Sequence, residues 1–371
     1  MHKLIDPNDT NIDNIYNLES VIKQQVNKLN DLREKVSKLE FVPVDPAGTY
    51  QSVTYKAIDG GKMKISFNPL EMDLIEVTDS NGNLKMRFAV PKISEESNLD
   101  KSDGLDNDAI IKKFLQIFGK THLSEISEIF NQSDSYMELS EWACLFEKIM
   151  DQKEDPLLVM RDGLLRTKKI KAELIPSLLD VLKQKSNLVK LVGVAKTSKV
   201  IDLLSTAISI ENLFPKGTIG FIKIPKDLEI EAYTWTGKGR KSDSNNRIIF
   251  AFGDLYIAKL SRDSNLLVTV EIPRDLDNNE DIYSEDDIIK IMGHLAKDSE
   301  SSYPVLGYPQ TIMRAHEAAA RVGFPATILR DKIMDKLKES MDDSARDFMT
   351  NAVVLNEFVD KGVLGGGYNY E

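Results

Sequence analysis

An alternation of apolar, strand-like runs with amphipathic helices over residues 157–224 constrains the fold of this chain more than any other feature. A buried strand is expected from Leu157 to Met160. It is followed in turn by helix, strand, helix and strand at residues 172–186, 188–195, 197–209 and 218–224. This order is typical of a parallel sheet whose strands are joined by crossover helices. The pattern therefore predicts an α/β fold.

The region before this alternation has hairpin signals instead. Two pairs of short strands surround the turn sequences Asp59-Gly60-Gly61 and Asp79-Ser80-Asn81-Gly82. The strands expected here are residues 52–58, 63–67, 70–78 and 84–90, and helical periodicity follows at residues 109–119, 122–131 and 136–151. We therefore expect a mixed sheet that is antiparallel at its start and is flanked by helices.

The remaining segments complete an expected domain plan. Further strands are expected at residues 229–236, 247–259 and 265–272, and further helices at residues 285–297, 310–322 and 327–340. Apolar residues at steps of three or four over residues 12–40 predict a long amphipathic helix with a nearly heptad seam. The plan is an N-terminal helix in residues 1–45 for dimer formation or docking, one α/β domain in 46–340 with an acidic insertion at about 92–135, and a C-terminal helix with a flexible tail in 341–371.

Charge and cysteine content exclude several classes of protein. The chain has 48 Lys and Arg against 59 Asp and Glu, a net charge of −11, which argues against binding nucleic acid through uniform basicity. Its single cysteine, Cys144, lies in an apolar run and indicates a buried thiol in a reducing compartment. No signal-peptide pattern and no long apolar run occur, so we expect a cytoplasmic protein that does not enter a membrane.

The familiar catalytic motifs are absent. The chain contains neither the Gly-rich sequence of a P-loop nor that of a dinucleotide-binding turn, and it has no G-x-S-x-G elbow. His316-Glu317 is not followed by the second histidine of a zinc protease. The chemistry is therefore expected to depend on carboxylates.

Two Asp-Gly dipeptides, Asp59-Gly60 and Asp162-Gly163, each follow an apolar run of strand character. An aspartate at a strand end is held rigidly, and the following glycine lets a phosphate or metal approach the backbone. Two adjacent carboxylates need a cation between them, which predicts Mg²⁺ or Mn²⁺. The alternative is that each dipeptide is an ordinary turn.

A third carboxylate is expected from the helix at 136–151, which offers Glu138, Glu141 and Glu147. Glu138 falls in a capping-box pattern with Ser135, which would use it on the helix's own amides, so Glu141 is the better choice. His316 has small alanine neighbours that leave room for a metal or substrate. Tyr308 lies near the start of the same helix, about two turns away.

One segment of this acidic chain is rich in basic residues. Between Leu157 and Val200 ten basic residues stand against three acidic ones, a net charge of +7 directly after the second aspartate. The alternative is a solvated surface. The residues chosen as nucleic-acid contacts are Arg161, Arg166, Lys168, Lys169 and Lys196.

Four segments, taken in order, resemble the NurA family of DNA end-processing nucleases. They are Ala57-Ile58-Asp59-Gly60, Leu158-Val159-Met160-Arg161-Asp162-Gly163-Leu164-Leu165, Val192-Gly193-Val194-Ala195-Lys196-Thr197-Ser198, and Gly307-Tyr308-Pro309 with Ala315-His316. The chain departs from the family where it has Asp-Gly-Gly in place of Asp-Gly-Ser, and where the acidic loop 94–108 lengthens the gap to Asp162.

This resemblance implies a ribonuclease-H-like core that uses two Mn²⁺ or Mg²⁺ ions to hydrolyse DNA as a 5′→3′ exonuclease and single-strand endonuclease. It also implies a homodimer that works with a HerA-type hexameric ATPase in DNA end resection or anti-phage defence. By position, Asp59 would bridge the ions, and Glu141, Asp162 and His316 would complete their ligation. Tyr308 would orient water or a phosphate oxygen, and Lys196 would offset charge in the transition state.

Two competing hypotheses have the same fold. One is a catalytically silent DNA clamp or docking module for an ATPase. The other is a different metal-dependent phosphotransferase, such as a resolvase-like or guide-dependent nuclease. The presence of both aspartates and of His316 favours the nuclease over the clamp.

Overall fold

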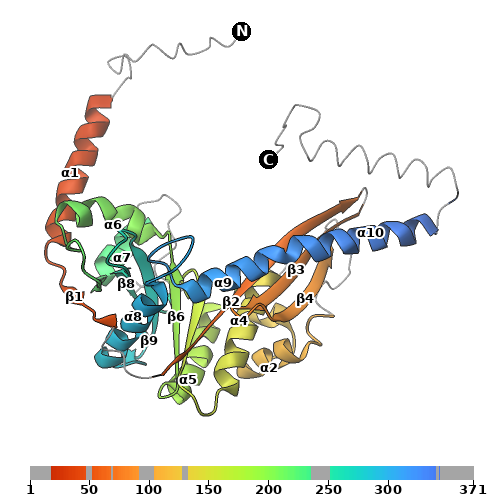
Figure 1. Cartoon of the computed structure of the whole chain (residues 1–371). Helices are drawn as coiled ribbons and strands as arrows, with labels where there is room; N and C mark the ends of the chain where they lie inside the picture. The colour runs from red at the N-terminus through yellow and green to blue at the C-terminus, as the bar shows by residue number, and fades with distance from the viewer. Residues whose placement is uncertain are drawn as a thin grey trace, which may run out of the picture. The chain divides into compact units, whose positions relative to one another are not determined.

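The computed structural model describes residues 18–46, 52–67, 70–91, 104–127, 133–234, 251–339 and 342. The chain divides into two compact units. Unit 1 comprises residues 1–51, 163–166 and 192–310, and unit 2 comprises residues 52–162, 167–191 and 311–371. Each unit has its own strands and its own covering helices (Figure 1).

The strands of unit 2 form a mixed sheet in the order β5-β2-β3-β4. They are β2 (Thr54–Phe67), β3 (Leu70–Asp79), β4 (Leu84–Pro91) and β5 (Leu157–Asp162). β2 pairs antiparallel with β3 and β3 with β4, whereas β5 lies parallel to β2. At the β3–β4 turn the Asp79 carboxylate accepts bonds from the amides of Asn81 and Asn83, and Gly82 adopts a φ of 79°. The predicted mixed α/β sheet flanked by helices is confirmed.

β2 corrects one prediction, because it runs through Asp59-Gly60-Gly61 without turning. A Cβ on Gly60 would lie 2.6 Å from Oε1 of Glu141, and a Cβ on Gly61 would lie 2.8 Å from the carbonyl carbon of Ala319. The two glycines therefore do not form a turn. They let elements on opposite faces of the sheet approach the strand closely.

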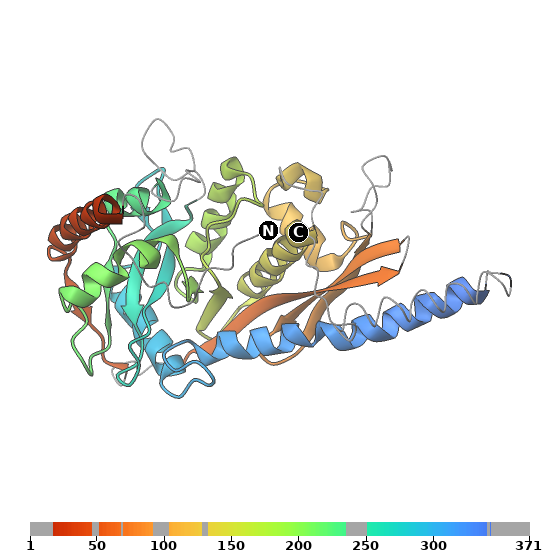
Figure 2. The same cartoon turned by 90° about the horizontal axis from the view of Figure 1, so that it is seen from above.

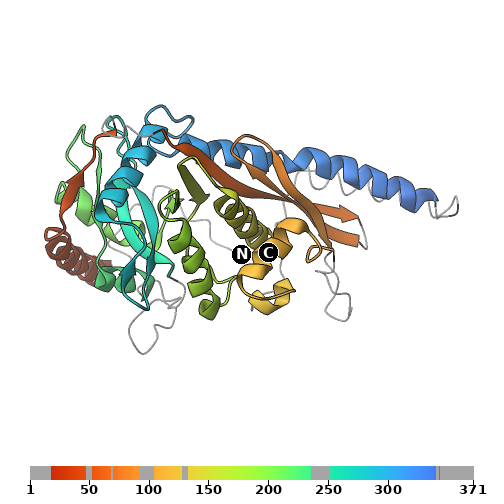
Figure 3. The ribbon, with the colours of Figure 1, turned by 90° about the horizontal axis from the view of Figure 1, so that it is seen from below.

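Helices cover both faces of the unit 2 sheet. They are α2 (Ala109–Ile117), α3 (Leu123–Ile126), α4 (Ser133–Asp151), the 3₁₀ turn η3 (Ala172–Leu174), α5 (Ile175–Lys185), α9 (Gln310–Ala319), the 3₁₀ turn η4 (Ala320–Val322) and α10 (Gly323–Glu339). α4 packs on β2 and β3, with α2 and α5 against it (Figure 3). η4 and α10 pack on the other face, where Ile65 and Leu74 contact Val322 and Ala326 (Figure 2).

Unit 1 is built on antiparallel strands in the order β1-β7-β8-β9-β6, with β10 added to β9. They are β1 (Phe41–Pro43), the end of β6 (Val189–Ala195), β7 (Gly220–Lys223), β8 (Gly253–Lys259), β9 (Val268–Asp275) and β10 (Glu280–Asp281). The helices are α1 (Leu18–Val36), α6 (Lys199–Ile210), α7 (Lys226–Thr234) and α8 (Glu285–Ser299). One apolar cluster joins α1, α6 and α7 to β7 and β8.

Two predictions about this region were wrong. Residues 229–236 were expected to be a strand, but residues up to Thr234 belong to helix α7. Leu228 and Ala232, four residues apart, are buried in the apolar cluster, and Glu229 is buried as an ion-pair partner. Because apolar and polar residues alternate in this segment, its sequence resembles that of a strand and does not show this helical spacing. β7 was expected in a parallel sheet, but it pairs antiparallel with β1 and β8.

The predicted N-terminal helix is confirmed over Leu18–Val36. Residues 12–17, the acidic stretch 94–103 and the C-terminal tail from residue 343 lie outside the described residues. Among the helices that the structure describes, none has the length and apolar character needed to cross a membrane.

Candidate metal centre

The parallel pairing of β2 with β5 brings Asp59 and Asp162 together. The register aligns Ile58 with Arg161, so the next residue on each strand is an aspartate, and both side chains lie on the same face of the sheet. Asp162 ends β5, as predicted, whereas Asp59 lies in the middle of β2. A rigid strand pair therefore holds the two carboxylates.

Helix α9 adds His316 on this face. Its Nδ1 lies 3.0 Å from Oδ2 of Asp59 and 3.9 Å from Oδ2 of Asp162. One ligand atom from each of the three residues fits within 4.8 Å of the others. The His316 side chain is 57% exposed and the two aspartates are partly exposed, so the cluster opens to solvent.

Glu141 approaches Asp59 from helix α4 on the other face. The amide of Gly60 donates to Oδ1 of Asp59 at 3.0 Å and to Oε1 of Glu141 at 3.1 Å. The two carboxylates therefore share one donor at the point where Gly60 lets α4 approach the strand. Glu141 is not one of the three residues whose ligand atoms cluster within 4.8 Å.

Burial of these carboxylates disfavours their charged forms. Burial raises the pKa of Asp59, the neighbouring Asp162 adds to this effect, and His316 opposes it. Burial also raises the pKa of Glu141 to about 8; Arg161 opposes the shift, whereas Asp59 and Glu138 add to it. Concentrated negative charge of this kind is what a divalent cation would stabilise.

The two alternative glutamates of α4 have other partners. Glu138 accepts a bond from Nη2 of Arg161 at 3.1 Å, and Glu147 lies 3.0 Å from the Lys85 ammonium. The expected capping box with Ser135 is wrong, because α4 begins two residues earlier, at Ser133. Among the three glutamates, Glu141 is the one that meets Asp59 through the shared amide.

Arg161 and Arg166, which were predicted to contact DNA, are held by carboxylates instead. Arg161 is 10% exposed, and its Nη2 lies 3.6 Å from Oε2 of Glu141 besides its bond to Glu138. In unit 1, Arg166 is 3% exposed and is paired with Glu229 and Glu271. Sequence patterns could not show these partners, because two of them lie 63 and 105 residues away from Arg166.

The basic residues Lys168 and Lys169 of unit 2 stay accessible. Lys168 is exposed, and Lys169 is partly exposed and donates to the hydroxyl of Ser135 at 3.0 Å. Both remain predicted DNA contacts.

Tyr308 belongs to unit 1 and is fully buried. Its hydroxyl donates to the carbonyl of Val194 at 2.9 Å, and the Lys196 ammonium lies 4.3 Å from the centre of its ring. A hydroxyl bound in this way is not presented to water or phosphate. We therefore replace the predicted role of Tyr308 with that of a support for Lys196.

Sequence reasoning missed two features of the site. The Gly60 amide and the Arg161 guanidinium both hold Glu141, one by a hydrogen bond and the other by charge. Arg161 could have been found from alternation, since it directly precedes Asp162 and must therefore point to the opposite face, toward α4.

The chain is similar to several solved structures. One is the NurA nuclease from Sulfolobus solfataricus, at 15% identity and a TM-score of 0.40, over 88% of this chain and 96% of that chain. Another is a NurA bound to dAMP and manganese, at 10% identity and a TM-score of 0.41, over 82% and 93%. A third is an Endonuclease V from Bacillus subtilis, at 10% identity and a TM-score of 0.29, over 85% and 95%. The comparison with curated proteins gave no match.

Fold and site together define an α/β protein with a cluster of two carboxylates and an imidazole on a mixed sheet. The NurA domain matches residues 54–321, from the first residue of β2 into η4. The chain belongs to the NurA domain family, as the four sequence segments predicted.

Proposed function

We propose that this protein is a metal-dependent nuclease that hydrolyses phosphodiester bonds in DNA. The observation that carries the proposal is the cluster of Asp59, Asp162 and His316, whose ligand atoms lie within 4.8 Å of one another in a chain of the NurA domain family. Both strands and the helix that hold these side chains are regular elements, which suits a site that must keep its geometry during catalysis.

The side chains fit a divalent cation with oxygen and nitrogen ligands. Carboxylates suit Mg²⁺ and Mn²⁺, and the imidazole of His316 favours Mn²⁺. Asp59, Asp162 and His316 would hold the first ion. Glu141, which shares the Gly60 amide with Asp59, would add ligands for a second ion with Asp59 between the two.

When bound, the metal supplies a water of lowered pKa and stabilises the leaving oxygen. The chain's own residues orient this chemistry. Gly60 donates to Asp59 and Glu141 together and so fixes both carboxylates. Arg161 pairs with Glu138 and with Oε2 of Glu141. Its positive charge therefore lies on the α4 side of the sheet, where it stabilises the charged form of Glu141. Lys196, whose ammonium lies over the ring of Tyr308 within unit 1, is proposed as a contact for the negative charge of DNA.

Family membership supports the finer features of the proposal. They are 5′→3′ exonuclease and single-strand endonuclease activity, a homodimer formed or docked through residues 1–45, and cooperation with a HerA-type hexameric ATPase. The setting would be DNA end resection or anti-phage defence in the cytoplasm. The amphipathic helix α1, which lies outside the matched region 54–321, supports the docking role.

End-labelled DNA tests the activity directly. Single- and double-stranded oligonucleotides labelled at the 5′ or the 3′ end are incubated with the full chain in Mn²⁺, Mg²⁺ or EDTA. We expect cleavage with Mn²⁺ and none in EDTA. Asp59→Asn and Asp162→Asn should each lower the rate by at least about a hundredfold, since each removes a ligand charge.

Glu317→Gln is the matched control, because it removes an exposed acidic charge next to His316 and should retain the wild-type rate. DNA binding by the wild type without cleavage in any metal, with or without its ATPase, would overturn the nuclease proposal in favour of the DNA clamp.

A further inference from the structure

Phe324 is an unusually exposed aromatic residue in unit 2. Its side chain is 75% exposed, whereas the other large apolar residues exposed in the described part of this unit, Met63, Leu84 and Ile328, are 43–45% exposed. An isolated exposed leucine or methionine needs no explanation, but a phenyl ring with three quarters of its surface in water is costly to maintain. Its position therefore matters.

Phe324 lies on the same helical run as the metal-site histidine. α9, η4 and α10 follow one another without a break, and Figure 2 shows them as one extended rod beside the sheet. Eight residues separate His316 from Phe324, which corresponds to ~12 Å along a helix axis. Phe324 is therefore within reach of nucleotides that neighbour a phosphate bound at His316.

The junction around Phe324 is anchored on the sheet of unit 2. Pro325 has no amide hydrogen to bond the carbonyl of Arg321, and the amide of Gly323 bonds that carbonyl instead. On the buried side, Val322 and Ala326 pack against the sheet. The aromatic ring is thus carried by an anchored helix rather than by a loop.

Accessible positive charge accompanies the ring. Arg314 and Arg321 are exposed, and within the described part of the chain neither guanidinium group has a hydrogen bond or an ion pair. They contrast with Arg161, whose guanidinium is held by carboxylates. Glu317 is the acidic side chain exposed between them. The exposed side of this run therefore combines an imidazole, two guanidinium groups and a phenyl ring.

We propose that Phe324 is a stacking platform for an unpaired base of the DNA strand being cut, with Arg314 and Arg321 contacting the phosphates on either side of His316. This inference rests on the proposed nuclease function. Single-strand-binding grooves combine basic side chains with aromatic rings in this way, because every base offers a face for stacking. A paired base is already stacked in its duplex, so the platform favours single-stranded ends.

Phe324 lies just outside the region that matches the family, and a nearby residue gives a control. The NurA match ends at residue 321, before Phe324. Ile328 lies one turn further along α10 and is 43% exposed, which gives a control position of the same exposed, apolar kind without an aromatic ring.

The test compares binding of two fluorescent oligonucleotides of equal length, one of thymidines and one made of abasic residues, by anisotropy in EDTA. The wild type should bind the thymidine strand about tenfold more tightly, within the range for base–aromatic stacking. Phe324→Leu keeps apolar volume without the ring and should bind both strands equally, whereas Phe324→Trp should keep the preference. Arg321→Gln should weaken both strands alike, and Ile328→Ala should change neither. Melting temperatures verify that each variant is folded.

Equal affinity of the wild type for both strands, or an equal loss for both in Phe324→Leu, would overturn stacking. The cleavage assay with end-labelled DNA distinguishes failure of the stacking proposal from failure of the proposed nuclease function. Base-dependent binding without cleavage in Mn²⁺ overturns the nuclease and leaves the platform, whereas cleavage without base dependence overturns the platform alone.

Discussion

The amide of Gly60 is the residue-scale feature on which the candidate metal centre depends. It donates to Asp59 and to Glu141 at nearly the same distance, 3.0 and 3.1 Å, and so holds together two carboxylates that come from opposite faces of the sheet. Two carboxylates that share one donor disfavour each other's charged form, so protonation of one of them or a bound cation stabilises the pair. Protonation and metal binding at Glu141 are therefore alternatives.

This leads to a prediction about pH. In the unfolded chain Glu141 ionises near its ordinary pKa of 4.5, but in the folded chain burial raises that pKa to about 8. Between these two values the folded state binds more protons than the unfolded state, so the free energy of unfolding falls as pH rises. The pKa of Asp59 is also raised, so Asp59 lowers the free energy of unfolding in the same way as pH rises above the ordinary pKa of an aspartate. Glu141→Gln should flatten this decline, measured as urea unfolding in EDTA from about pH 5 to about pH 8.

The exposed Glu317 gives the control, since Glu317→Gln should keep the wild-type slope. Added Mn²⁺ should raise the melting temperature of the wild type more at about pH 8 than at about pH 6, because the metal binds the ionised carboxylates. If the free energy of unfolding of the wild type instead rose between about pH 5 and about pH 8 in EDTA, Glu141 would not be buried in its protonated form.

At the scale of elements, β2 positions the site because helices approach it closely from both sides. Gly60 faces α4, and Gly61 faces the end of α9. The same strand carries Asp59 and pairs with the strand that ends at Asp162. Close packing at Gly61 therefore sets the distance between His316 on α9 and the two aspartates.

Alanine substitutions should distinguish the close contact of α4 at Gly60 from the close contact of α9 at Gly61. In Gly61→Ala the new Cβ meets the backbone of Ala319, which cannot move without shifting α9, so we expect a loss of about 2–4 kcal/mol in unfolding free energy and weaker Mn²⁺ binding. In Gly60→Ala the Cβ meets the ends of the Glu141 and Met137 side chains, which can rotate, so we expect a loss of about 1–2 kcal/mol. Denaturant unfolding and calorimetric titration with Mn²⁺ measure both effects.

Gly104 provides a neutral comparison, because a Cβ there meets no atom within 4 Å. If Gly61→Ala proved as stable as Gly104→Ala, α9 would not be in close contact with β2.

The same elements indicate how far the sequence could predict the structure. The β3–β4 hairpin and strand β5 were predicted because their signals are local: turn residues with Gly82 for the hairpin, and an apolar run ending in Asp-Gly for the strand. The pairing of Asp59 with Asp162 followed from two such runs. The continuity of β2 was not predictable, since the need for Gly60 and Gly61 comes from α4 and α9, which lie far away in the sequence.

Partners at long range explain the other failures. Arg166 belongs to a basic run, and only the folded chain brings Glu271 to it. Glu229 is polar but fully buried, so the segment that contains it did not show the period of helix α7. Both errors concern buried charges, which composition and periodicity treat as surface.

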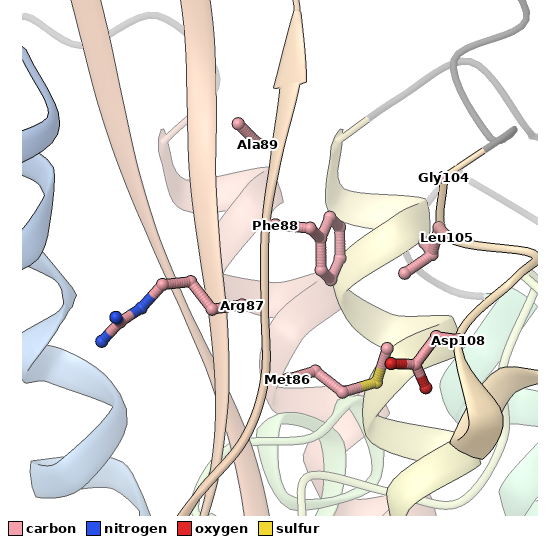
Figure 4. Close-up of a pocket in the computed structure, with 7 residues that line it drawn as sticks. All are labelled: Met86, Arg87, Phe88, Ala89, Gly104, Leu105 and Asp108. Atoms are coloured by element: carbon pink, nitrogen blue, oxygen red, sulfur yellow. The ribbon is translucent and has the colours of Figure 1, made fainter.

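A pocket beside β4 in unit 2 shows side-chain directions that the sequence does predict. Figure 4 shows Phe88 and Leu105 facing each other across it, while Arg87 points to the opposite face of the strand. Alternation along β4 accounts for these directions, and the Asp108 carboxylate at its rim caps α2 by accepting from the amide of Ile110. This carboxylate thus has a structural role.

For the whole molecule, a net charge of −11 disfavours uniform attraction to DNA and makes two copies of the chain repel each other, so an interface between two copies would need apolar contact. Helix α1 offers such contact. Its C-terminal half is anchored in unit 1 by the buried residues Leu32 and Val36 and by an ion pair between Arg33 and Glu211 at 2.7 Å. Its N-terminal half exposes Val21, Ile22 and Val26, each to about half of its surface.

We expect this exposed half to pair with the same helix of a second copy of the chain, because its apolar residues repeat at nearly heptad spacing. Substituting Ile22→Asp together with Val26→Asp places charge in that seam and should convert the dimer to a monomer, measured as the mass in solution by light scattering. Gln24→Asp together with Asn27→Asp adds the same charge outside the seam and should leave the dimer intact. Both variants should cleave short single-stranded DNA as the wild type does, because α1 carries none of the proposed metal ligands. A dimer that survives the seam substitutions would exclude α1 as the dimer contact.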